Sequence, residues 1–200
     1  ATLGEEALRA PRRILVPRIV LPDGRLQDSA QAEPASAATA LAALMPPAAL
    51  PRVLAQRIEP WRGEVPGAAA WGLGACLVAG AETLRRLGPF DEGIFMFGED
   101  LDLGLRARDA DIGIEHRPDA RVFHGRAHST HRAYGGEPFE LLAERRRDVV
   151  EKRRGRARRR ADDVIQALTF ANRIALKTLL RRGTERERAQ LRGLRAARKR

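Results

Sequence analysis

The sequence predicts an α/β fold followed by a basic helical extension, and three observations support this. Over residues 1–140, short apolar runs bounded by Pro, Gly and Asp alternate with amphipathic segments, which is typical of strands joined to helices. Residues 141–200 have a helical pattern instead. Charge divides at the same point, because residues 141–200 hold 21 Lys and Arg against 7 Asp and Glu, a net charge of +14, and residues 1–140 carry −3.

The first expected elements are two short strands joined by a tight turn. Val16–Gln27 predicts an apolar strand, a Pro-Asp-Gly turn and a second short strand. The Ala- and Pro-rich stretch Ala30–Ala55 predicts a loop followed by a short helix, to which we assign no chemistry. Trp71–Ala79 then predicts a glycine-bearing turn that leads into an apolar strand. There, Gly72 and Gly74 would let a ligand approach the backbone closely.

The segment Pro89–Arg106 is the most informative part of the chain. It contains five carboxylate side chains among aromatic residues but a single basic residue, Arg106. Burying carboxylates without a cationic or hydrogen-bonding partner costs free energy of folding. The pattern predicts a helix that starts near Gly98. Its first turn would hold Glu99, Asp100 and Asp102, where the helix dipole favours ionised carboxylates and one of them could act as a general base. Acids in a first turn also serve as ordinary helix caps, and this segment alone leaves that alternative open.

Two further strands follow the acidic segment. Ile112–His116 predicts a strand, Arg117-Pro118-Asp119 a turn, and Arg121–His124 a second strand that ends in a histidine. The order is therefore a glycine turn, a strand, a helix, an acidic helix start, a strand and a strand-terminal histidine. Taken together, this order is specific enough to resemble a known family.

Trp71–His128 resembles the second half of the catalytic domain of the family 2 glycosyltransferases, which are inverting nucleotide-sugar enzymes of the GT-A fold, and particularly their bacterial rhamnosyltransferase-like branch. The resemblance is carried by Gly74-Ala75-Cys76, Gly88–Glu92, Phe95–Leu103, Arg106 and Pro118–His124. It implies a partial GT-A fold with a mixed sheet over residues 1–140. The family's nucleotide-binding first half, with its Asp-X-Asp metal motif, has no counterpart here, so the chain is interpreted as a C-terminal part of such an enzyme.

The resemblance also implies roles for individual residues. Asp100 would be the general base that removes a proton from the acceptor hydroxyl. Glu99 would shape the environment of Asp100 or, as the less favoured alternative, be the base itself. His124 would help to hold a divalent metal, Mg²⁺ or Mn²⁺, or the diphosphate of the nucleotide-sugar donor. The residues expected to contact donor or acceptor are Trp71, Gly74, Ala75, Asp102, Arg106 and His128.

Some of these residues have a structural alternative. Arg106 is expected to pair with the neighbouring acids, since it lies one helical turn after Asp102. His124, His128 and His131 have the spacing of three metal ligands on one helix face, but Gly125 and the preceding strand argue against a helix there. A three-histidine zinc site is therefore the less favoured interpretation.

The implied function is transfer of a sugar from a nucleotide sugar to a glycan or lipid-linked acceptor in cell-envelope polysaccharide synthesis. The single cysteine, Cys76, excludes an internal disulfide, which is compatible with the cytoplasm. The longest apolar run, Val164–Leu180, is interrupted by polar and charged residues and does not predict a membrane span. We expect a cytoplasmic protein, peripheral at the inner face of the cell membrane.

The basic extension suggests how such attachment could occur. One helix face would carry Val164, Leu168, Ala171, Ala175 and Leu179, and another Arg173, Lys177 and Arg181. A basic amphipathic helix suits an anionic membrane surface, although the same helix could pack on its own domain. A non-catalytic basic protein that binds nucleic acid or an anionic membrane is the alternative function. Nucleic acid is not the expected partner, since no recognised nucleic-acid motif accompanies the arginine runs.

Overall fold

The computed structural model describes residues 2–45, 50–94, 96–125 and 134–199. The chain forms two compact units. One unit combines residues 1–33 with 51–126, and the other combines residues 34–50 with 127–200. The association of residues 34–50 with the C-terminal unit was not expected from the sequence, while the boundary at residue 140 stays a prediction.

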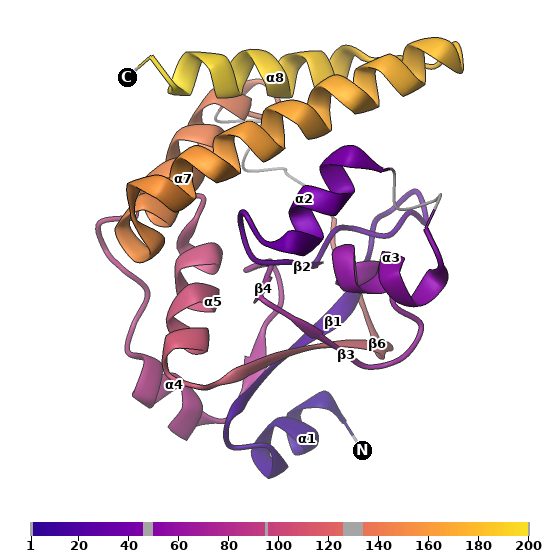
Figure 1. Cartoon of the computed structure of the whole chain (residues 1–200). Coiled ribbons are helices and arrows are strands. Elements are labelled where there is room, and N and C mark those ends of the chain that lie inside the picture. Colours follow the sequence, from indigo (N-terminus) through magenta and orange to yellow (C-terminus); the bar gives the residue numbers. More distant parts are fainter. Residues whose placement is uncertain (1, 46–49, 95, 126–133, 200) are drawn as a thin grey trace. The chain divides into compact units, whose positions relative to one another are not determined.

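The first unit is built on a mixed four-stranded sheet (Figure 1). Its strands, in spatial order, are β3 (Gly67–Ala69), β6 (Gly113–Phe123), β1 (Arg13–Val20) and β5 (Val78–Ala79). β1 and β6 are parallel, and the other two pairs are antiparallel. A separate two-stranded sheet joins β2 (Ala30–Gln31) to β4 (Trp71–Gly72). The predicted α/β class with a mixed sheet is therefore confirmed.

β1 is the central strand and is buried along most of its length. Ile14, Val16 and Ile19 are at most 1% exposed, as expected for a strand covered on both faces. The chain then turns through Pro22-Asp23-Gly24, where Gly24 has a φ of 78° and the Gly24 N–H donates to the Leu21 carbonyl at 2.9 Å. The predicted turn is confirmed. The second strand expected after it is reduced to an isolated bridge between Val20 and Leu26.

β6 corrects the prediction of two strands with a turn between them. The strand is continuous, and its pairing with β1 jumps from Pro17 opposite Arg117 to Arg18 opposite Arg121. Residues 118–120 therefore form a bulge within the strand. The Arg117 guanidinium holds the bulge, because it donates to the Asp119 carboxylate at 2.7 Å and also pairs with Glu6. Pairing with β1 resumes at Arg121, so the strand continues in the same direction beyond the bulge.

Helices α1 (Leu3–Arg9), α4 (Ala81–Leu87) and α5 (Glu99–Asp109) complete the first unit, together with α3 (Arg52–Ile58) and the short 3₁₀ helix η2 (Pro60–Arg62). The core contains apolar side chains of β1, of α5, of β6 and of the connection between α5 and β6, namely Ile14, Val16, Leu103, Ala107, Ile112 and Ile114. Gly104 lets α5 approach β4 closely, since a Cβ at this position would lie 2.3 Å from the Trp71 Cβ. This contact positions the start of α5 beside the turn that follows β4.

The second unit is helical. It contains α2 (Ala37–Leu44), α7 (Phe139–Leu179) and α8 (Glu185–Ala197), and α8 runs alongside the second half of α7 (Figure 1). α7 is interrupted at Gly155, whose φ of 82° is outside the helical range. The stretch Ala30–Ala55 thus holds β2, α2 and the start of α3, where a loop and one short helix were expected. No helix in the described part of the chain is long and apolar enough to cross a membrane.

Candidate active site

The acidic segment forms the helix start that the sequence predicts. Gly98 is the N-cap of α5, with Glu99, Asp100 and Asp102 in the first turn. Gly98 has a φ of 92° and the preceding Phe97 a φ of 65°, so two consecutive residues are in the left-handed region. A non-glycine residue in this region is strained and persists only where its surroundings hold it. The backbone at the start of α5 is therefore held in a defined conformation.

Asp100 is the central group of this site. Its carboxylate is buried, and it accepts a hydrogen bond at 3.1 Å from the Gly74 backbone N–H and one at 2.7 Å from that of Leu101. The pKa of Asp100 is raised to about 6, chiefly by burial and also by the Glu99 carboxylate, while the backbone N–H groups oppose the shift. A carboxylate with this pKa is mostly ionised at pH 7 and is basic enough to accept a proton.

Glu99 lies on the same side of the helix start. One oxygen, Oε2, is buried and has no hydrogen-bond partner among the described residues. The other, Oε1, lies 3.9 Å from the point where a Cβ on Gly74 would be. Both carboxylates therefore face the backbone of Gly74. Gly74 and Ala75 are themselves exposed, so the turn after β4 forms an open rim beside the two acids.

Asp102 and Arg106 have a different environment. Asp102 is fully buried, and Arg106 Nε donates to its Oδ2 at 2.9 Å, which confirms the predicted pairing. The same guanidinium donates to the carbonyls of Leu87 and Pro89. These contacts tie α5 to the chain that leads into the acidic segment. The geometry explains both residues as a structural clamp, and their contact with substrate stays a prediction.

Trp71 and Gly72, which precede the exposed turn, are engaged in packing. Trp71 is half-buried against Gly104, and its Nε1 donates to the Ala32 carbonyl at 3.2 Å. A Cβ on Gly72 would lie 2.5 Å from Val16 Cγ2, so this glycine accommodates β1 and not a ligand. Stacking of a sugar ring on Trp71 stays a prediction.

His124 follows β6, as expected from the sequence. Its backbone N–H donates to the Val20 carbonyl at 3.0 Å, and its Nδ1 lies 2.8 Å from Gln27 Oε1. The described residues contain no group of three or more His, Cys, Asp or Glu side chains able to hold a metal ion. His128 and His131 lie outside the described residues. Within the described ranges the side chains therefore do not assemble a site for Mg²⁺ or Mn²⁺, and the role of His124 stays a prediction.

Two buried residues were not singled out from the sequence. His116 is fully buried, and neither ring nitrogen has a hydrogen-bond partner among the described residues. The pKa of His116 is lowered to about 4, chiefly by burial and also by the neighbouring Arg18 guanidinium. Arg18 is 7% exposed and donates to the Gly63 carbonyl at 2.6 Å. The one sequence feature that could have indicated this cluster is an arginine within an apolar strand.

Comparison with known proteins gives a partial similarity. No family model matches the chain. A segment of 88 residues is 38% identical to N-acetylglucosaminyl-diphospho-decaprenol L-rhamnosyltransferase from two strains of Mycobacterium tuberculosis. The segment covers 44% of this chain and 26% of each relative, so the match spans about a quarter of the relatives' length. The similarity supports a glycosyltransferase-like family.

Proposed function

We propose that the chain is part of an inverting family 2 glycosyltransferase with a GT-A fold. It transfers a sugar from a nucleotide sugar to a glycan or lipid-linked acceptor in cell-envelope polysaccharide synthesis. The observation that carries the proposal is Asp100, a buried carboxylate with a raised pKa beside the exposed rim of Gly74 and Ala75. The relatives support the reaction class, because their name describes a rhamnosyltransferase acting on a decaprenol-linked sugar.

Asp100 is the general base in this proposal. It accepts the proton of the acceptor hydroxyl while the hydroxyl oxygen attacks the anomeric carbon of the donor. The nucleoside diphosphate leaves from the opposite face with the electrons of the broken bond, so the configuration inverts. Glu99 helps to keep the pKa of Asp100 near the working pH, which is where a general base is most effective. Gly74 and Ala75 present open backbone where the sugar would lie.

Further residues and a metal ion complete the proposal. Trp71 would contact a sugar ring, and His128 would lie over the mouth of the site. A divalent metal would neutralise the diphosphate leaving group, with His124 as one ligand. Because the described residues do not assemble a metal site, no step above depends on the metal. We place the protein in the cytoplasm, at the inner face of the cell membrane where a lipid-linked acceptor would be reached.

The test is transfer from a panel of nucleotide sugars, with Mg²⁺ or Mn²⁺, by the longest natural form of the protein. Asp100→Asn should lower the transfer rate about a thousandfold, because general-base catalysis contributes about 10² to 10⁴. Below pH 6 the rate of the unchanged protein should fall about tenfold per pH unit as Asp100 becomes protonated. Rates are measured with saturating donor across pH 5 to 8.

The matched control is Asp109→Asn, an exposed acid at the other end of α5, which should leave the rate within twofold of the unchanged protein. Equal transfer by the Asp100→Asn protein would remove Asp100 as the base. No transfer from any donor by a folded full-length protein would overturn the reaction class and favour the alternative, a non-catalytic basic binding protein.

A further inference from the structure

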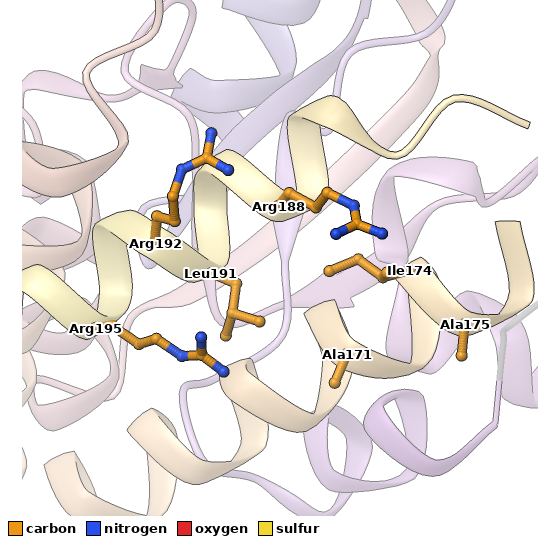
Figure 2. A pocket seen from close by; sticks show the side chains of 7 residues that line it. All are labelled: Ala171, Ile174, Ala175, Arg188, Leu191, Arg192 and Arg195. Atoms are coloured by element: carbon orange, nitrogen blue, oxygen red, sulfur yellow. The ribbon is translucent and has the colours of Figure 1, made fainter. Parts of the chain in front are cut away.

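A groove between α7 and α8 is the most distinctive surface of the second unit. Its volume is about 460 Å³, and it is lined by Ala171, Ile174, Ala175, Leu191, Arg188, Arg192 and Arg195. Figure 2 shows Ile174 and Leu191 between the guanidinium groups of Arg188 and Arg195. The groove therefore combines an apolar floor with three cationic side chains on its α8 side.

These three arginines differ from others in the same unit. Arg146, Arg147 and Arg159 pair with buried carboxylates of α7. Arg192 and Arg195 are exposed and form no ion pair with a carboxylate within the described ranges. Arg188 donates from Nε to the Thr184 hydroxyl at 2.9 Å, which leaves its terminal nitrogens available. The groove thus presents cations that the fold does not neutralise.

An exposed apolar stripe on α7 adjoins the groove. Val164 is 51% exposed, Leu168 43% and Leu179 80%, and Ala171 and Ala175 lie between them on the same helix face. These are the residues that the sequence predicts for one apolar face. The chain carries no Asp or Glu between Val164 and Gly183, but it carries four Lys or Arg. A partner that covers this face therefore meets apolar side chains and positive charge together.

We propose that this face of the α7–α8 pair docks on an anionic lipid bilayer. The phosphates of the headgroups bind Arg188, Arg192 and Arg195, while Leu168, Leu179 and the groove floor lie at the level of the glycerol and upper acyl chains. Long cationic side chains reach headgroup phosphates while their stems cover apolar surface. Charge complementarity selects this occupant, because a nucleic acid would also attract the arginines but would leave the leucines in water. The proposal does not rest on the transferase reaction.

The experiment is flotation of the full chain with vesicles made of equal parts phosphatidylglycerol and phosphatidylcholine, and with vesicles of phosphatidylcholine alone. The chain should float only with the anionic vesicles. Arg188→Gln, Arg192→Gln and Arg195→Gln combined should weaken partitioning about a hundredfold, since each cation near the headgroups contributes about fivefold. Leu168→Ser combined with Leu179→Ser should weaken it about tenfold or more.

The matched control replaces three exposed arginines of the other unit, Arg52, Arg57 and Arg86, with glutamine. It removes the same charge, so a comparable loss in the control would show that net charge alone acts and would overturn the proposed surface. Equal flotation with both vesicle types would also overturn it. So would tighter binding of duplex DNA than of vesicles, with the same dependence on the three groove arginines. All substituted side chains are exposed, and circular dichroism should show unchanged helix content.

Discussion

Each of the two units holds a pair of adjacent carboxylates that is at least partly removed from solvent, but their surroundings are opposite. On α7, Asp162 and Asp163 are each 3% exposed. Asp162 pairs with Arg146 at 2.7 Å, and Asp163 pairs with Arg147 and with Arg159. At the start of α5, Glu99 and Asp100 have no Lys or Arg within ion-pair distance among the described residues, and Asp100 is held by backbone N–H groups alone.

This difference separates acids that a cation neutralises from acids that have no cationic partner among the described residues. A guanidinium partner compensates the desolvation of a carboxylate, and the pair then joins two parts of the fold. Asp162 does this, since it also accepts from the Ala35 N–H and so anchors residues 34–50 to α7. Without a cation, burial raises the pKa of Asp100 instead, which costs stability but leaves a reactive carboxylate. The α7 pair therefore stabilises the fold, whereas Asp100 on α5 has the raised pKa that the proposed role as a general base requires.

The largest expected effect on stability comes from the α7 pair. Asp162→Ala should lower the free energy of unfolding by about 3 kcal/mol, because it leaves Arg146 without its partner and removes the acceptor for Ala35. Chemical denaturation followed by circular dichroism measures the change. Asp148→Ala is the control, since Asp148 forms an exposed pair with Arg145 at 3.8 Å that should contribute under about 1 kcal/mol. Equal losses of unfolding free energy in the two variants would contradict the structural role of the buried α7 pair.

His116 extends the comparison to a buried base. Its pKa is about 4 in the folded protein, below the value of about 6.5 in the unfolded chain, so the unfolded state binds more protons between these pH values. The stability of the unchanged protein should therefore decrease as the pH falls from 6.5 to 4, by about 3 kcal/mol relative to His116→Gln. Paired denaturation curves at several pH values measure this difference. A stability difference that does not change with pH would show that His116 has the same pKa in the folded and unfolded states, and would contradict this prediction.

Asp100 should show the opposite pH dependence. Its pKa of about 6 is above that of an unfolded aspartate, so its ionisation costs stability as the pH rises from 4 to 6. Asp100→Asn should consequently be more stable than the unchanged protein by about 2 kcal/mol at pH 7, with no gain at pH 4. Thermal melts at both pH values test this, with Asp109→Asn as the exposed control. A loss of stability at pH 7 would place Asp100 with the structural acids.

Sequence reasoning predicted the local structure of the acidic segment better than it predicted the sheet. Gly98 as the start of α5, the acids in its first turn and the Asp102–Arg106 pair all follow from spacings of four residues or fewer. The contact between Asp100 and Gly74 joins residues 26 positions apart, and only the resemblance to a family suggested that both belong to one site. The metal-binding role of His124 and the sugar contacts of Trp71 and His128 are predictions still.

By itself, the sequence determined the elements whose causes are local. The turn at Asp23-Gly24, the amphipathic pattern of α5 and the separation of positive charge into residues 141–200 depend on neighbouring side chains and on backbone preferences. Tertiary structure alone decided that β6 continues through a bulge, that residues 34–50 join the C-terminal unit, and that His116 is buried without a partner. Strand pairing and desolvation depend on residues far apart in the chain, so periodicity along the sequence does not encode them.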